Sequence, residues 1–160
     1  MHMDRRRDLI VATDDFRLSQ REIDLVRSQG PVLQPRLGEI ADVYYAHLLT
    51  THYARLLTPD RIDGLKAARI EHWRLLLAAD FAAIQTDYMD NFGPRLLDGG
   101  FPQSIFVVAS QWFVLELCRF VDRSNDIPKT LKSELRGALT KLAFFDLALA
   151  QAAREVAWLD

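Results

Sequence analysis

The stretch PKTLKSELRGALTKLAFFDLALAQAAREVAWL, residues 128–159, decides the fold class of this chain. Its apolar side chains recur every three or four residues, which is the period of an α-helix and not that of a strand. One stripe along such a helix consists of Leu135, Ala138, Leu142, Phe145, Leu149, Ala152 and Val156. A second stripe consists of Leu131, Leu139, Ala143, Leu147 and Ala150. The spacing predicts one long helix with two apolar faces, one for its own core and one for a partner helix; the alternative is that one domain covers both.

The helical period continues outward from this stretch towards the N-terminus. Further helices are expected within residues 18–30, 31–49, 58–81, 81–98 and 102–122, and Gly93 and Pro94 interrupt the fourth of these. No segment alternates between polar and apolar residues as a half-buried strand does. The sequence therefore predicts an all-α domain with short connections.

Local signals indicate where the first of these helices begins and ends, and where the next one bends or restarts. Ser19 followed by Glu22 is a capping-box pattern, so a helix is expected to begin there. Gly30 is expected to end that helix, because glycine is frequent just after the last helical turn. Pro35 indicates a bend or a restart, because proline removes a backbone donor.

Composition excludes several classes of protein. The 160 residues suit one domain, and the formal net charge of −2 gives no general attraction to nucleic acid or to an anionic membrane. The single cysteine, Cys118, excludes an internal disulfide and a cysteine-based zinc site. No unbroken apolar run reaches the roughly 18 residues of a membrane span. We expect a cytoplasmic protein.

Motifs for catalysis are missing from the sequence. There is no glycine-rich phosphate loop and no nucleophile elbow. The four histidines are His2, His47, His52 and His72, and none has the spacing of a helical metal site. We expect the chain not to be an enzyme.

Several side chains are candidates for a ligand pocket. Met89, Phe92 and Leu96 share one face of a helix, because they are three and four residues apart. Leu65 and His72 are seven residues apart and share a face of an earlier helix. Tyr44 and Tyr45 are adjacent, so at most one of them is expected to point squarely inward. Ordinary core packing is the alternative for all these residues.

Three pieces of the chain carry a resemblance to a known family. They are VYYAHLL at residues 43–49, LKAARIEHW at 65–73 with the following Asp80–Phe81, and FGPRLLDGGFP at 92–102. Their order and ungapped spacing resemble the globin domain of bacterial globin-coupled sensors, in the protoglobin group, over roughly residues 18–156. The resemblance implies a globin-like fold of about six to eight helices. Residues 1–17 are then an N-terminal extension with room for a short helix, and residues 18–160 are the sensor domain.

The resemblance also implies a cofactor and exposes a departure from the family pattern. Family members bind haem b, with a histidine on the iron and a tyrosine, here Tyr45, near the distal ligand. Counting through the ungapped stretch places the histidine position at Leu96, which has no lone pair for iron, and leaves His72 as the fallback iron ligand. Where the family usually shows Trp-Tyr, this chain has Ile105–Phe106. The implied pocket consists of Tyr45, Leu65, His72, Met89, Phe92, Leu96 and Ile105.

The resemblance implies a regulatory module without the usual haem ligation. Such a domain would dimerise through its last two helices, with Leu139, Ala143, Leu147 and Ala150 at the interface. It would act on a kinase, a cyclase that makes cyclic dinucleotides, or a chemotaxis receptor. The alternatives are a haem-binding gas sensor with altered ligation through His72 or Tyr45, and a module for another apolar ligand, such as a fatty acid or an iron-free tetrapyrrole.

Overall fold

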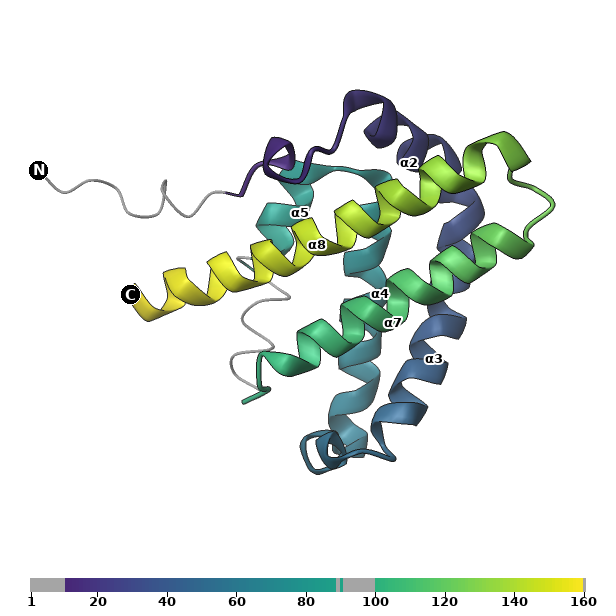
Figure 1. Ribbon diagram of the computed structural model, residues 1–160. Helices are drawn as coiled ribbons and strands as arrows, with labels where there is room; N and C mark the ends of the chain where they lie inside the picture. Colours follow the sequence, from purple (N-terminus) through teal and green to yellow (C-terminus); the bar gives the residue numbers. More distant parts are fainter. Residues whose placement is uncertain (1–10, 89, 91–99, 160) are drawn as a thin grey trace, which may run out of the picture.

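A computed structural model describes residues 11–88, 90 and 100–159 of the chain, and side-chain burial as far as residue 154. Within these residues the secondary structure is helical, without strands, as the sequence predicted (Figure 1). The α-helices are α2 (Gln20–Leu33), α3 (Leu37–Leu48), α4 (Pro59–Ala78), α5 (Phe81–Asp87), α7 (Ser104–Arg123) and α8 (Lys129–Leu159). Short 3₁₀-helices are η1 (Thr13–Phe16), η2 (Gln34–Arg36) and η3 (His52–Leu56).

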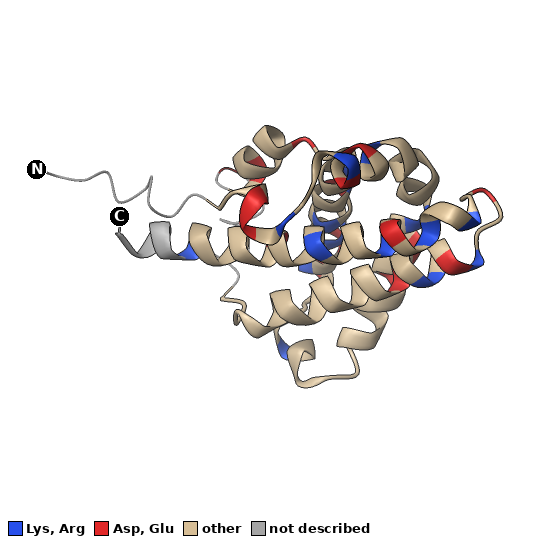
Figure 2. Ribbon diagram, turned by 45° about the horizontal axis from the view of Figure 1, so that its top comes forward, with Lys and Arg blue, Asp and Glu red and all other residues tan. Residues whose placement is uncertain are grey.

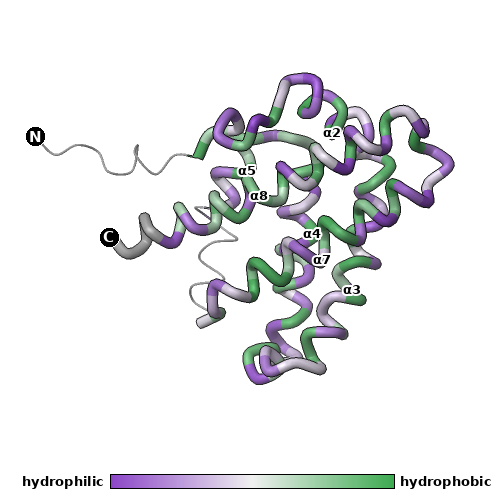
Figure 3. The backbone as a smooth tube through the Cα atoms, viewed as in Figure 1, coloured by the Kyte–Doolittle hydropathy of each residue, from purple (hydrophilic) through white to green (hydrophobic). Residues whose placement is uncertain are grey.

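The two longest elements near the C-terminus form an antiparallel hairpin. Helices α7 and α8 run side by side from the loop that joins them, and α3 and α4 lie behind α7 (Figure 1). Helix α2 packs against both α8 and α4. Apolar residues recur along α7 and α8 between polar ones (Figure 3). The largest fully buried side chains, contributed by four helices, are Trp73, Tyr44, Phe113 and Phe145.

Gly30 does not end its helix. Helix α2 continues through Gly30 and Pro31 to Leu33, so the predicted boundary was wrong by about one turn. A Cβ atom on Gly30 would lie 2.7 Å from the carbonyl oxygen of Leu77 in α4. The missing side chain therefore allows the backbones of α2 and α4 to approach closely, which is a second common use of glycine.

The other local signals are confirmed. The Ser19 hydroxyl accepts a hydrogen bond from the Glu22 backbone N–H at 3.1 Å, and the Ser19 backbone N–H donates to the Glu22 carboxylate at 3.2 Å. Pro35 lies within η2, where α2 ends and α3 restarts. Helix α4 begins at Pro59, within the range in which a helix was expected.

Helix α7 is long and apolar enough to span a membrane by length and composition, which the search for an unbroken apolar run missed. In the structure one face of α7 is buried against α3 and α8. That face includes Ile105, Ala109, Phe113, Leu117 and Val121. A core helix of a globular domain has the same composition, so this helix is weak evidence for a membrane span.

The two apolar stripes of α8 have different surroundings. The first stripe is buried from Leu135 to Leu149, as expected for the core. The second stripe was expected to face a partner, but Leu139 and Ala143 are already buried within the chain, and Leu147 and Ala150 are half-buried. The reason is that α8 packs against α2 on one side and α7 on another, so one domain covers most of both stripes.

Candidate functional site

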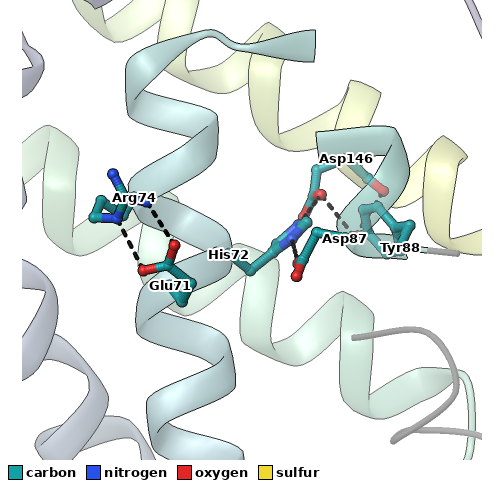
Figure 4. A network of polar contacts seen from close by, with 6 residues as sticks. All are labelled: Glu71, His72, Arg74, Asp87, Tyr88 and Asp146. Carbon is teal, nitrogen blue, oxygen red and sulfur yellow. Dashed lines mark hydrogen bonds and ion pairs between the residues drawn. The ribbon is translucent and has the colours of Figure 1, made fainter. Parts of the chain in front are cut away.

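A buried histidine joins three helices inside the domain. His72 is the fourteenth residue of α4, and its side chain is fully buried. Its Nδ1 lies 2.9 Å from Oδ2 of Asp87, the last residue of α5. Its Nε2 lies 2.6 Å from Oδ1 of Asp146 in α8 (Figure 4). The imidazole therefore bridges two carboxylates that belong to different helices.

This geometry determines the charge of the ring. A neutral imidazole has one N–H donor and one lone pair, whereas a carboxylate only accepts. With a carboxylate at each nitrogen, both nitrogens of His72 must donate, so the ring is an imidazolium. Burial opposes that charge, but the carboxylates of Asp146 and Asp87 outweigh it and raise the pKa of His72 above its ordinary value.

Tyr88 completes the environment of Asp146. Its hydroxyl donates to Oδ1 of Asp146 at 2.6 Å and lies 3.2 Å from the backbone carbonyl oxygen of the same residue. Its ring meets the imidazole of His72 edge-on, with centroids 4.5 Å apart. Burial and the neighbouring Asp146 raise the pKa of Tyr88 well above its ordinary value, so the hydroxyl remains a donor.

Arg69 supplies a second buried cation, one turn before His72 on α4. Its guanidinium carbon lies 5.5 Å from the centre of the Phe106 ring. Tyr45, Tyr88 and Asp146 are all close enough to act on its charge. Among the described residues, the cations Arg69 and His72 lie close to the carboxylates of Asp87 and Asp146, and buried charges require such pairing.

The structure brings together some residues of the predicted pocket. Tyr45 and Ile105 are buried, and Leu65 is half-buried. The hydroxyl of Tyr44 donates to the carbonyl oxygen of Ile105 at 3.5 Å, which joins α3 to α7. The other predicted members, Met89, Phe92 and Leu96, lie outside the described residues.

The expectation that only one of the adjacent tyrosines points inward was wrong. Both Tyr44 and Tyr45 are buried, and their rings contact edge-on with centroids 5.0 Å apart. Helix α3 packs against α4 on one side and α7 on the other, so neighbouring positions have different partners. Tyr44 packs against Phe113 of α7, and Tyr45 lies near Arg69 of α4.

Sequence reasoning missed Arg69, Asp87, Tyr88 and Asp146. One signal was available, because Asp146 follows Phe144 and Phe145 and precedes a run of apolar residues. A carboxylate in such an apolar segment has to be paired if it is buried. Periodicity says which face of a helix is buried, but it does not say which residue of another helix lies opposite.

The comparison with protein families agrees with this helical architecture. The protoglobin family model matches residues 11–157. The chain belongs to the protoglobin family. The match begins at residue 11, within the predicted extension, and runs through the described helices from η1 to all but the last two residues of α8. No curated protein matches the chain at a significant level.

Haem is the cofactor that membership of the protoglobin family implies, and the described histidines do not fit its iron. Both ring nitrogens of His72 donate to carboxylates, so His72 has no lone pair for a metal, and the geometry argues against it as the fallback ligand. Within the described part of the chain, the other histidines are His47 and His52, which are exposed. Their rings rest against Trp112 and Tyr53 at centroid distances of 4.9 Å and 4.1 Å. No described histidine presents a free nitrogen to the interior.

Proposed function

We propose that this protoglobin-family chain is a regulatory sensor domain that does not hold haem iron through a histidine. The observation that carries the proposal is the double carboxylate contact of His72. An imidazolium cannot ligate iron, and removing a ring proton would leave one buried carboxylate without its donor. At the proximal position implied by the family pattern, the sequence has Leu96.

The visible spectrum of the purified protein, with and without added haemin, tests this proposal. We expect weak uptake and no sharp Soret band, because neither Leu96 nor the paired His72 offers a ligand. A protein that carries one haem per chain with a sharp Soret band would overturn the proposal. Replacement of His72 by Ala should leave whatever haem spectrum is seen unchanged.

A second candidate function is haem binding through Tyr45. Its side chain is buried beside Arg69 of α4. A tyrosine is a known axial ligand of haem iron in other proteins. A haem spectrum that survives His72→Ala but is lost in Tyr45→Phe would favour this candidate.

The regulatory part of the proposal concerns the α7–α8 hairpin. Three of its large apolar side chains are exposed in the single chain: Val107 and Leu115 of α7, at 53% and 43%, and Phe144 of α8, at 58%. Val107 and Phe144 lie at similar distances along the hairpin from the connecting loop. The half of the hairpin away from this loop is nearly free of charged residues (Figure 2). A surface of this kind is suited to a partner of similar apolar character.

We propose that a second copy of the chain covers this surface. Two hairpins related by a twofold axis would form a four-helix bundle. A shift within the bundle would pass along α8 to a separate or attached output, such as a kinase, a cyclic-dinucleotide cyclase or a chemotaxis receptor, in the cytoplasm. In this role the chain transmits a signal and catalyses no reaction.

A further inference from the structure

We propose that His72 is a proton-dependent clamp. In its imidazolium form it ties the C-terminal end of α5 to the middle of α8, and loss of one ring proton releases that end of α5. The inference goes beyond the proposed function, because it requires neither a ligand nor a second copy of the chain.

Helix α5 packs along α4, where Ile84 is fully buried, and it is joined to α8 near its two ends. This helix spans only Phe81–Asp87, which is too short to be stable by itself. At its start Phe81 contacts the ring of Phe145 in α8, edge-on, with centroids 5.5 Å apart. At its end Asp87 reaches Asp146 of α8 through the ring of His72. The clamp is therefore at the end of α5 that leads onward along the chain, and the aromatic contact is at the other end.

The surroundings of the ring explain why one proton matters. Asp87 and Tyr88 face it from the α5 side, Asp146 faces it from α8, and Arg69 lies one turn away on α4. With His72 charged, Arg69 and His72 match the two carboxylates. Without that charge, the carboxylates of Asp87 and Asp146 lose one of the cations that stabilise them in a buried region.

The structure also indicates which bond is lost. A neutral ring has a single N–H, so only one of the two carboxylates keeps its donor from His72. Asp146 is fully buried and already shares Oδ1 with the Tyr88 hydroxyl, whereas the Asp87 side chain is 9% exposed at the edge of the cluster. Asp87 can turn towards water at less cost than Asp146. We therefore expect the ring to keep its bond to Asp146, and the end of α5 to open.

The sign of the pH dependence follows from the contacts. The carboxylates raise the pKa of His72 in the folded chain above that of an unfolded histidine. The stabilisation is therefore complete below the ordinary histidine pKa and is lost as the pH rises through the higher, folded value. The clamp is closed at pH values below the raised pKa of His72 and opens above it.

Amide hydrogen exchange in the full chain, measured across this pH range and corrected for the intrinsic rate, tests the clamp. We expect residues 81–88 to exchange roughly 10- to 100-fold faster once His72 is neutral, because a charge-assisted hydrogen bond is lost. The amide exchange rates of α3 should not show the same dependence on pH. In His72→Gln, which cannot become charged, exchange at residues 81–88 should be fast at every pH.

The matched control is Glu39→Gln, which removes an exposed ion pair with Arg36 at 3.4 Å at the start of α3. This variant should keep the wild-type pH profile. A His72→Gln variant with the wild-type profile would overturn the proposal. If that variant does not fold, ring ¹⁵N shifts of the wild type decide: two protonated nitrogens on His72 at neutral pH support the clamp, and one refutes it. None of these results depends on whether haem binds.

Discussion

Nε2 of His72 donates to Oδ1 of Asp146 across 2.6 Å, although the two residues are 74 positions apart in the sequence. The same oxygen accepts from the Tyr88 hydroxyl at an equal distance. Asp146 thus receives donors from two segments and holds them against the longest helix of the domain. Loss of the Asp146 carboxylate should therefore lower the stability of the whole domain.

Replacing Asp146 by Asn should lower the free energy of unfolding by about 3 kcal/mol, because it leaves the His72 imidazolium without one of its two counter-charges in the core. Urea denaturation measures this cost. The control is Glu134→Gln, which breaks the Arg21–Glu134 ion pair at 2.6 Å on the surface and should leave the midpoint nearly unchanged. Equal midpoints for the two variants would contradict a structural role for the buried pair.

The stability difference between the wild type and His72→Gln should depend on pH. It should be largest below the ordinary histidine pKa and should shrink as the pH rises through the raised pKa of His72, because the wild type then loses its extra charge. Denaturation of both proteins in a series of buffers gives the difference at each pH. A difference that grows with pH would mean that the ring is neutral in the folded chain.

Replacing Gly30 by Ala should destabilise the domain despite the better helix propensity of alanine. The new Cβ would lie 2.7 Å from the backbone oxygen of Leu77, so α2 and α4 would have to move apart. Gly137 is the matched control, because it lies within α8 and a Cβ there meets nothing within 4 Å. Gly137→Ala should stabilise by roughly 0.5–1 kcal/mol. Thermal melts of the two variants should therefore shift in opposite directions.

Charges on the exposed face of the hairpin should separate the proposed dimer. The variant carries both Leu115→Glu and Phe144→Glu, which place like charges near the twofold axis, and sedimentation at micromolar concentration should then report a folded monomer. Val43→Glu adds a charge at a similarly exposed apolar residue of α3 and should leave the dimer intact. A wild type that sediments as a monomer at that concentration would rule out this interface.

Leu96→Ala and Leu96→His should differ in haem uptake. The histidine supplies an iron ligand at the position that the family spacing indicates, whereas the alanine only removes side-chain volume. Titration with haemin should show a sharper Soret band and tighter binding for the histidine variant. Equal titrations would show that the family register does not apply at this position.

The sequence predicted the helical class because helix periodicity is a local property. The capping box at Ser19 and the restart near Pro35 were predictable for the same reason, since each depends on neighbours a few residues away. The role of Gly30 was not predictable, because a helix end and a close helix contact favour the same residue. Only the position of Leu77 on another helix distinguishes the two.

Contacts between distant helices could not be predicted at the candidate site either. The spacing predicted that Leu65 and His72 share one face of a helix. Only the structure shows that Asp87 and Asp146 lie at the two ring nitrogens of His72. Two of the four predicted interface residues, Leu139 and Ala143, are buried within the chain for a related reason. Two apolar stripes on α8 indicate two packing partners, and α2 and α7 of the same chain are those partners at Leu139 and Ala143.

The carboxylate of Glu22 both caps α2 and accepts from Lys141 of α8 at 2.8 Å. Lys141 also donates to the carbonyl oxygen of Arg17, at 3.0 Å, just before that cap. The start of the first long helix is thus secured by the last one. On the ribosome, α2 emerges early but lacks this support until α8 has been synthesised. The contacts of α2 are therefore complete only once α8 is available, and we expect the early helices to be open to chaperones until then.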